Sequence, residues 1–177
     1  MPELPEVQTV IDDLQTAGLA GRTVLSAVVQ WPRTVGGLPE EFQDKVVGRV
    51  ITGLTRRGKW IVLWTSPVED DGAILVHLRM SGRLFLCRSD EPLGGYERVR
   101  LVLEGDRELR FHDPRKFGRF LFTTDPQTAL SRLGLEPLDA AFTGAAFATV
   151  CRSRRRQIKP LLLDQRVVAG LGNIYTD

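Results

Sequence analysis

The sequence predicts an α+β protein, in which an N-terminal helix flanks an antiparallel β-sandwich and the beginning of an all-α domain follows. Three observations support this fold class. Apolar residues recur at helical spacing near the N-terminus, short β-branched runs alternate with turn residues, and beyond Thr124 the pattern becomes helical again. We therefore divide the chain into a β-sandwich domain, residues 1–132, and a second part, residues 133–177, that holds a linker and the start of a helical domain.

The predicted N-terminal helix runs from Pro5 to Gly18. Its apolar residues are spaced three and four positions apart: Val7, Val10, Ile11 and Leu14. Glu3 and Glu6 lie near its N-terminal end, where the helix dipole favours negative charge. Gly18 is suited to end the helix, because glycine readily adopts the left-handed conformation found there.

The predicted strands lie in four runs: Thr23–Trp31, Val46–Thr65, Ala73–Cys87 and Tyr96–Thr124. Turn residues separate or interrupt them: Gly36-Gly37, Asp70-Asp71-Gly72, Gly94-Gly95 and Gly105-Asp106. Short strands joined by such turns are typical of an antiparallel sandwich.

Beyond Thr124, residues 125–133 and the segment from Phe142 onward are predicted to be helical, with a linker at Gly134–Asp139. Asn173 follows a glycine-rich turn and is suited to cap a further helix, whose N–H groups can bind a phosphate. The chain stops about one turn into this helix, so we expect a fragment of a longer protein or a truncated product, with apolar surface exposed around Leu161–Leu163.

Composition indicates an ordinary globular protein, with 42% hydrophobic and 26% charged residues. No apolar run approaches the roughly 20 residues that span a bilayer, and the acidic N-terminus is unlike a signal peptide. We therefore expect a cytoplasmic protein with no membrane partner. Cys87 and Cys151 do not form a Cys-x-x-Cys pair, so this chain has no zinc site of the usual spacing.

Positive charge is concentrated although the net charge is only +2. Residues 140–163 contain no acidic side chain, whereas five basic ones lie within eight positions: Arg152, Arg154, Arg155, Arg156 and Lys159. Such a cluster suits a polyanion such as nucleic acid. A solvated surface is the alternative interpretation.

The first residues suggest a nucleophile. An initiator methionine before proline is usually removed, which would leave Pro2 with a free secondary amine. An α-amino group titrates near pH ~8 and a lysine near ~10.4, so far more of the former is neutral at pH 7. Such an amine can attack a sugar carbon or aldehyde and form an iminium, and Glu3 beside it can transfer protons.

Two loop motifs suggest contacts to DNA bases. HLRMSG places Met80 before a Ser-Gly turn, and HDPRKFG places Arg115 and Phe117 in a loop bounded by proline and glycine. An apolar tip, an aromatic ring and an arginine on the loops of a basic protein can wedge into a base stack. Taken singly, each residue also fits a structural role.

Six motifs, in this order and spacing, resemble the formamidopyrimidine-DNA glycosylase family. They are MPELPEV, RRGKW, HLRMSG, DPRKFG, LGLEPL and IKPLLLDQRVVAGLGNIYTD, and they extend over essentially the whole chain. The resemblance implies a base-excision repair enzyme that removes oxidised purines, such as 8-oxoguanine and formamidopyrimidines, and then cleaves the abasic strand. It also implies that the last motif begins a helix–two-turn–helix DNA-binding element.

The resemblance assigns roles to individual residues. Pro2 is implied to attack C1′ of the damaged nucleotide, with Glu3 as acid/base and Lys59 assisting proton transfer and contacting phosphate. The resulting Schiff base would drive β- and δ-elimination. Implied DNA contacts are Met80, Arg115 and Phe117, which would fill the gap left by the flipped-out base, together with His77, Arg154, Lys159 and Asn173.

The family continues beyond GNIYTD with more helical domain and a four-cysteine zinc hairpin. We therefore expect no cofactor in this chain, reduced activity, and a nucleoid-associated monomer bound to double-stranded DNA that contains oxidised purines or abasic sites. Tyr96 lies near a loop position where relatives often have histidine. Two alternatives stay open. One is an endonuclease VIII-like enzyme for oxidised pyrimidines, which the leucine at position 4 (Leu4) disfavours. The other is a non-catalytic DNA-binding fragment.

Overall fold

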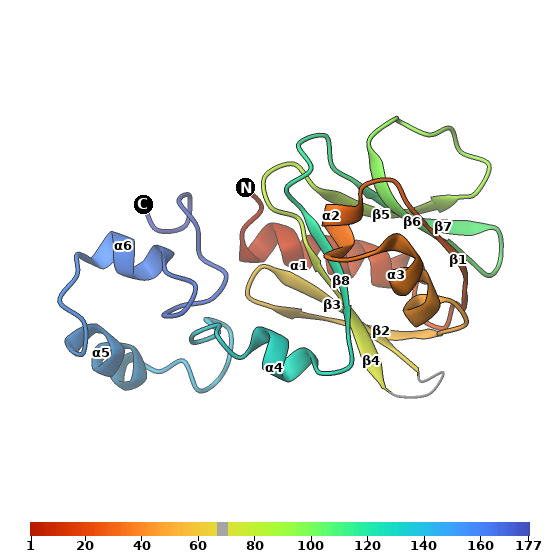
Figure 1. Ribbon diagram of the computed structural model, residues 1–177. Coiled ribbons are helices and arrows are strands. Elements are labelled where there is room, and N and C mark those ends of the chain that lie inside the picture. Colours follow the sequence, from red (N-terminus) through yellow and green to blue (C-terminus); the bar gives the residue numbers. More distant parts are fainter. Residues whose placement is uncertain (67–70) are drawn as a thin grey trace.

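The computed structural model describes residues 1–66 and 71–177, so Asp70 of one predicted turn lies outside the described residues. Within these ranges the chain forms two four-stranded sheets and six helices (Figure 1). In order, the elements are α1 (Leu4–Thr16), β1 (Val24–Val29), α2 (Pro32–Val35), α3 (Pro39–Val46), β2 (Ile51–Arg57), β3 (Trp60–Thr65), β4 (Gly72–His77), β5 (Arg83–Arg88), β6 (Glu97–Leu103), β7 (Arg107–His112), β8 (Arg119–Thr123), α4 (Pro126–Leu130), α5 (Gly144–Arg152) and α6 (Ile158–Leu163). The predicted α+β class is confirmed.

The two sheets are antiparallel and enclose the main core. Their strand orders are β1-β6-β7-β5 and β2-β3-β4-β8. Apolar residues on their inner faces pack together, and at the centre the ring of Phe120 lies 5.8 Å from that of Phe111 and 5.9 Å from that of Phe42, between centroids. Burial of this apolar surface is the dominant favourable contribution to folding.

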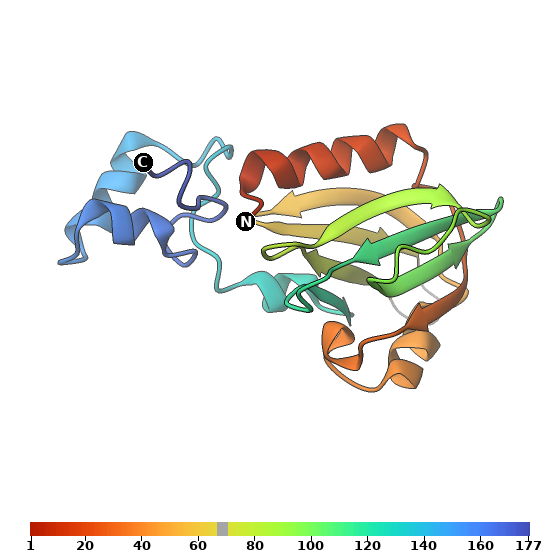
Figure 2. The same cartoon turned by 90° about the horizontal axis from the view of Figure 1, so that it is seen from above.

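Helices close both open sides of the sandwich. α1 packs against β2 and β5, the edge strands on one side, while α2 and α3 pack against β1 and β8 on the other (Figure 2). Covering edge strands in this way prevents them from pairing with other chains. α2 and α3 were not predicted from the sequence: the predicted strand run from Val46 begins with the last residue of α3, and β2 starts only at Ile51.

The predicted N-terminal helix is confirmed as α1. Its buried face consists of Leu4, Val7, Ile11 and Leu14. Glu3 and Glu6 form a capping box at its start, in which the Glu3 N–H donates to the Glu6 carboxylate over 2.8 Å.

α4 is shorter than the predicted helix at residues 125–133. Asp125 caps it, accepting a hydrogen bond from the Thr128 N–H over 3.0 Å, and it ends at Leu130. Leu130 packs on the outer face of the second sheet, against Val62 and Leu75. β4 is therefore buried on both faces.

Residues 133–177 form a smaller helical body beside the N-terminal end of α1 (Figures 1 and 2). Its own core contains Leu161, Val167 and Val168. The expected apolar surface around Leu161–Leu163 is wrong for Leu161, which is 2% exposed. The large apolar residues exposed in this body are Leu138, Ile158, Ile174 and Tyr175. None of the helices in the described ranges has the length and apolar character needed to cross a membrane.

Candidate functional site

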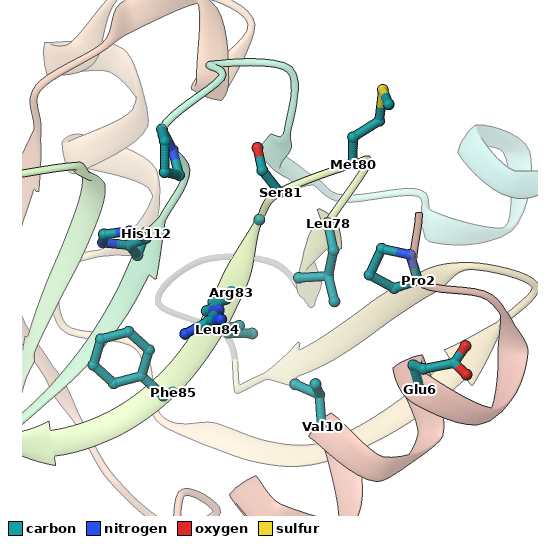
Figure 3. A pocket seen from close by; sticks show the side chains of 12 residues that line it. Pro2, Glu6, Val10, Leu78, Met80, Ser81, Arg83, Leu84, Phe85 and His112 are labelled. Carbon is teal, nitrogen blue, oxygen red and sulfur yellow. The ribbon is translucent and has the colours of Figure 1, made fainter.

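Pro2 lies on the wall of a pocket of about 850 Å³ (Figure 3). The wall also includes Glu6 of α1, Met80 and Ser81 of the loop after β4, and several residues of β5. Met1 is 53% exposed, so an aminopeptidase can reach it. Removal of Met1 would convert the Pro2 amide nitrogen into a free secondary amine on this wall.

Glu3 is buried, with 2% of its surface exposed. Its carboxylate accepts hydrogen bonds from three backbone N–H groups near the other end of the chain: Gly172 at 2.5 Å, Ile174 at 2.8 Å and Tyr175 at 3.4 Å. The Tyr175 hydroxyl also donates to Glu6 over 3.1 Å. The three bonds to Glu3 fix the position of its carboxylate.

The arrangement bears on the expectation for Asn173. Residues 173–176 form the single turn that follows Asn173, and the Thr176 hydroxyl closes it by donating to the Gly172 carbonyl over 2.8 Å. Glu3 occupies the N–H groups of Gly172, Ile174 and Tyr175, so the expectation that such groups face a phosphate is wrong for these three.

Gly172 permits this close approach because it lacks a side chain. A Cβ at this position would lie 2.4 Å from Cδ of Glu3. We expect Gly172→Ala to displace the Glu3 carboxylate and to lower the free energy of unfolding by about 1–3 kcal/mol, as overpacking does. Urea denaturation measures this loss, and Gly144→Ala, where a Cβ meets nothing within 4 Å, is the matched control. Equal stabilities of the two variants would contradict the tight contact at Gly172.

Lys59 occupies the turn between β2 and β3 and is only 4% exposed. Burial lowers the pKa of its ammonium group, and the carboxylates of Glu3 and Glu6 partly oppose this shift. A lysine with a lowered pKa exchanges protons more readily near neutral pH. Lys59 therefore lies close enough to Glu3, another predicted catalytic residue, to interact with it electrostatically.

The turn that carries Lys59 is anchored by Glu136, a residue that sequence reasoning missed. The Glu136 carboxylate accepts from the Gly58 N–H over 2.9 Å and from Arg57 over 3.0 Å, and it forms an ion pair with Arg56 at 2.5 Å. The sequence offered one signal for this contact: an acidic residue in the LGLEPL segment and two adjacent arginines before Gly58, which could form ion pairs.

His77 is buried at the end of β4. Its Nδ1 accepts a hydrogen bond from the Arg79 N–H over 3.0 Å, and its ring lies edge-on to Trp60 at 4.8 Å between centroids. Burial, together with the charges of Arg79, Lys59 and Arg119, lowers the pKa of His77 to about 3. At neutral pH His77 is therefore uncharged, and Nε2–H is its remaining donor.

The low pKa of His77 predicts a loss of stability on acidification. Between pH 6.5 and about 3 the unfolded chain binds a proton at His77 that the folded chain does not, so stability falls as the pH falls. The expected loss is up to about 1.4 kcal/mol per pH unit. Denaturation at pH 7, 6 and 5 should show this slope in the wild type and in His112→Gln, and a smaller slope in His77→Gln. Equal slopes in all three would contradict it.

Two adjacent loops carry the predicted wedge residues. Met80 is 52% exposed and Phe117 49%, and the Arg115 guanidinium carbon lies 5.0 Å from the Phe117 ring centroid. The Met80 side chain projects outward from the rim of the pocket (Figure 3). A hydrogen bond from the Ser81 hydroxyl to Asp113 joins the two loops, so the structure brings these residues to one face.

Arg154 and Lys159 lie apart from the pocket, in the helical body. Arg154 is 3.9 Å from the Asp164 carboxylate, and Lys159 pairs with Asp177. Exposed ion pairs of this kind contribute little to stability, so these cations are able to exchange partners. Tyr96 is exposed, with its ring edge-on to His112 at 5.6 Å.

No three His, Cys, Asp or Glu side chains are grouped as for a metal within residues 1–66 and 71–177. The two cysteines of the sequence do not fit a four-cysteine zinc site. The prediction that this chain holds no cofactor stays a prediction.

The chain is similar in sequence to known repair proteins. Residues 1–120 match the sequence model of the formamidopyrimidine-DNA glycosylase N-terminal domain, and residues 133–177 match that of the formamidopyrimidine-DNA glycosylase H2TH domain. Formamidopyrimidine-DNA glycosylases of Protochlamydia amoebophila and Roseiflexus sp. are 41% and 43% identical to it over the whole chain. The chain spans 63% and 65% of the lengths of these two relatives.

Solved structures of Lactococcus lactis Fpg have the same fold. Its complex with an oxidized pyrimidine containing DNA matches 99% of this chain, with a TM-score of 0.88 and 34% identity, over 66% of that protein. Its complex with an abasic site containing DNA matches 99% of this chain and 64% of that protein, with a TM-score of 0.88 and 33% identity. On its sequence and its fold, this chain belongs to the formamidopyrimidine-DNA glycosylase family.

Proposed function

We propose that this chain carries the active site of a bifunctional DNA glycosylase and abasic-site lyase for oxidised purines, 8-oxoguanine and formamidopyrimidines, in double-stranded DNA. The position of Pro2 is the main support: it lies on the wall of a large pocket, adjacent to the buried and firmly held Glu3. Within this proposal residues 1–132 are the catalytic β-sandwich domain, and residues 133–177 are a linker and the beginning of a helix–two-turn–helix DNA-binding domain.

The reaction uses the amine of Pro2 after Met1 is removed. The amine displaces the damaged base at C1′ and loses its proton. Its electron pair then forms the C1′=N bond while Glu3 protonates O4′ and the sugar ring opens, which leaves a cationic iminium. This iminium accepts electrons when a proton leaves C2′, so that the 3′-phosphate is expelled, and a second elimination expels the 5′-phosphate. Lys59, whose pKa burial lowers, assists these proton transfers. No step requires a cofactor from this chain.

The proposed DNA contacts lie on the exposed face and in the helical body. Met80, Arg115 and Phe117 fill the space left by the flipped-out base, and Arg115 faces the orphaned cytosine. Neutral His77 offers an N–H to a phosphate or the lesion. Arg154, Lys159 and Asn173 contact the DNA backbone, so binding weakens as salt rises. We expect a monomer at the nucleoid.

The complexes of Lactococcus lactis Fpg support a damaged-DNA partner. One holds an abasic site containing DNA, another an oxidized pyrimidine containing DNA, and a mutant of that protein was solved with a Fapy-dG containing DNA. Because a relative was solved with DNA that contains an oxidised pyrimidine, a test of this chain must include that class of lesion.

Borohydride trapping tests the proposal. The 177-residue chain, with Met1 removal checked by intact mass, is incubated with duplexes that contain an abasic site, 8-oxoguanine opposite cytosine, or an oxidised pyrimidine. We expect a reduced covalent adduct with the first two. Preference for the oxidised pyrimidine would instead favour endonuclease VIII-like specificity. Salt-dependent binding without any adduct would identify a non-catalytic DNA-binding fragment.

A further inference from the structure

We propose that Ser81 and Asp113 are positioning residues: their hydrogen bond holds the two wedge loops together, so that Met80 and Phe117 enter the base stack as one unit. The inference rests on the proposed function, because it concerns how these loops meet DNA. Neither residue belongs to the set of catalytic and DNA-contacting residues named above.

Asp113 lies at the junction of the two loops and is fully buried. One carboxylate oxygen accepts from the Ser81 hydroxyl over 2.5 Å, and the other accepts from the Gly118 N–H over 2.7 Å. The first distance is typical of a hydrogen bond to an ionised acceptor, which is stronger than a neutral one. A single carboxylate therefore joins the residue after Met80 to the residue after Phe117.

The backbone of Asp113 is fixed as well. Its carbonyl accepts from the buried Arg98 side chain over 2.8 Å, and its N–H donates to the Tyr96 carbonyl over 2.9 Å. Gly118 lies directly against the core, since a Cβ there would be 2.3 Å from the Phe111 ring. The carboxylate is consequently a rigid point to which the loop of Met80 is attached.

The wedge residues need such support because burial does not hold them. Met80 and Phe117 are each about half exposed, and each follows a residue in the left-handed conformation: Arg79 with φ 54° and Lys116 with φ 60°. Residues other than glycine adopt this conformation at an energetic cost and keep it only where surrounding contacts impose it. Lys116 gains one such contact from the Trp31 ring, 4.0 Å from its ammonium group. In the loop of Met80, the Arg79 N–H donates to His77 and the Gly82 N–H donates to the Leu78 carbonyl. These bonds hold the loop to its own strand, and the bond from Ser81 to Asp113 attaches it to the loop of Phe117.

The test compares Ser81→Ala with the wild-type chain on two duplexes. A paired 8-oxoguanine must be unstacked, which the wedge assists, whereas an abasic site has no base to extrude. We expect the ratio of the trapping rate on 8-oxoguanine opposite cytosine to that on the abasic duplex to fall on the order of 10-fold. We also expect a smaller fluorescence rise from 2-aminopurine placed beside the abasic site, which reports unstacking without chemistry.

Ser131→Ala is the matched control, because the Ser131 hydroxyl donates to the Thr128 carbonyl over 2.8 Å outside both loops. Asp113→Asn is the second variant and should reproduce the ratio change. The link is overturned if Ser81→Ala leaves both the rate ratio and the fluorescence rise unchanged. It is also overturned if trapping falls equally on both duplexes, because that indicates general destabilisation.

If the wild type forms no adduct, the proposed function fails, and the 2-aminopurine fluorescence alone decides whether the link exists. If the wild type gives no fluorescence rise either, the link is overturned too.

Discussion

A chain with one extra residue ahead of Pro2 after Met1 removal should form no borohydride-stable adduct with abasic-site DNA. The Pro2 nitrogen is then an amide without a reactive electron pair, and the new terminal amine is displaced by about 3.8 Å, one Cα spacing. Misplacement of a reacting group by about 1 Å already costs about 100-fold in rate. We therefore expect a decrease of more than 100-fold, measured by gel quantification of the trapped complex.

Pro2→Gly with normal Met1 removal is the matched control. It retains a terminal amine at the same position and should keep measurable trapping. The extra residue adds no charge, so salt-dependent DNA affinity should match the wild type. Undiminished trapping in the extended chain would show that another amine, such as Lys59, is the nucleophile.

Glu3→Gln should lower the rate of base excision by about 10²–10⁴-fold, the usual contribution of a general acid or base. It should also loosen the end of the chain. The carboxylate accepts from three N–H groups, and the amide group of glutamine would present N–H to at least one of them. Leaving buried donors unpaired costs about 1–3 kcal/mol, so amide exchange at Gly172 and Ile174 should become faster.

Hydrogen exchange followed by NMR measures the structural effect, and single-turnover kinetics on 8-oxoguanine measures the chemical one. Glu40→Gln, at an exposed position in the first turn of α3, is the control for loss of one carboxylate. If Glu3→Gln exchanges the Gly172 amide and excises the base at the wild-type rates, then Glu3 neither holds the end of the chain nor acts as the acid/base.

Much of the fold was predictable because local pattern dictates it. The apolar spacing in residues 5–18 corresponds to α1, and the four β-branched runs contain all eight strands of the described residues, apart from Gly72 at the start of β4 and Arg88 at the end of β5. The short helices α2 and α3 were missed although Pro32 and Pro39 occupy their first positions, where proline is favoured. Helices of four and eight residues depend on packing against β1 and β8, which no local pattern reveals.

The candidate site was predictable in its residues but not in its supports. Pro2, Glu3 and Lys59 were grouped through family resemblance, and the structure places Glu3 and Lys59 in buried positions. The partners of Glu3 lie 169 to 172 residues away along the chain. Their contribution is a backbone N–H, which every residue except proline has, so sequence carries no mark of it.

The sequence by itself determined the fold class, the N-terminal helix, the strand-forming runs and the side chains available for chemistry. These follow from periodicity and residue type, which act over a few positions. Only the tertiary structure decided that the turn at residues 173–176 binds Glu3, that Glu136 holds the turn of Lys59, and that Asp113 joins the two wedge loops. Such contacts depend on where distant backbone segments meet, and the burial of the whole core determines that.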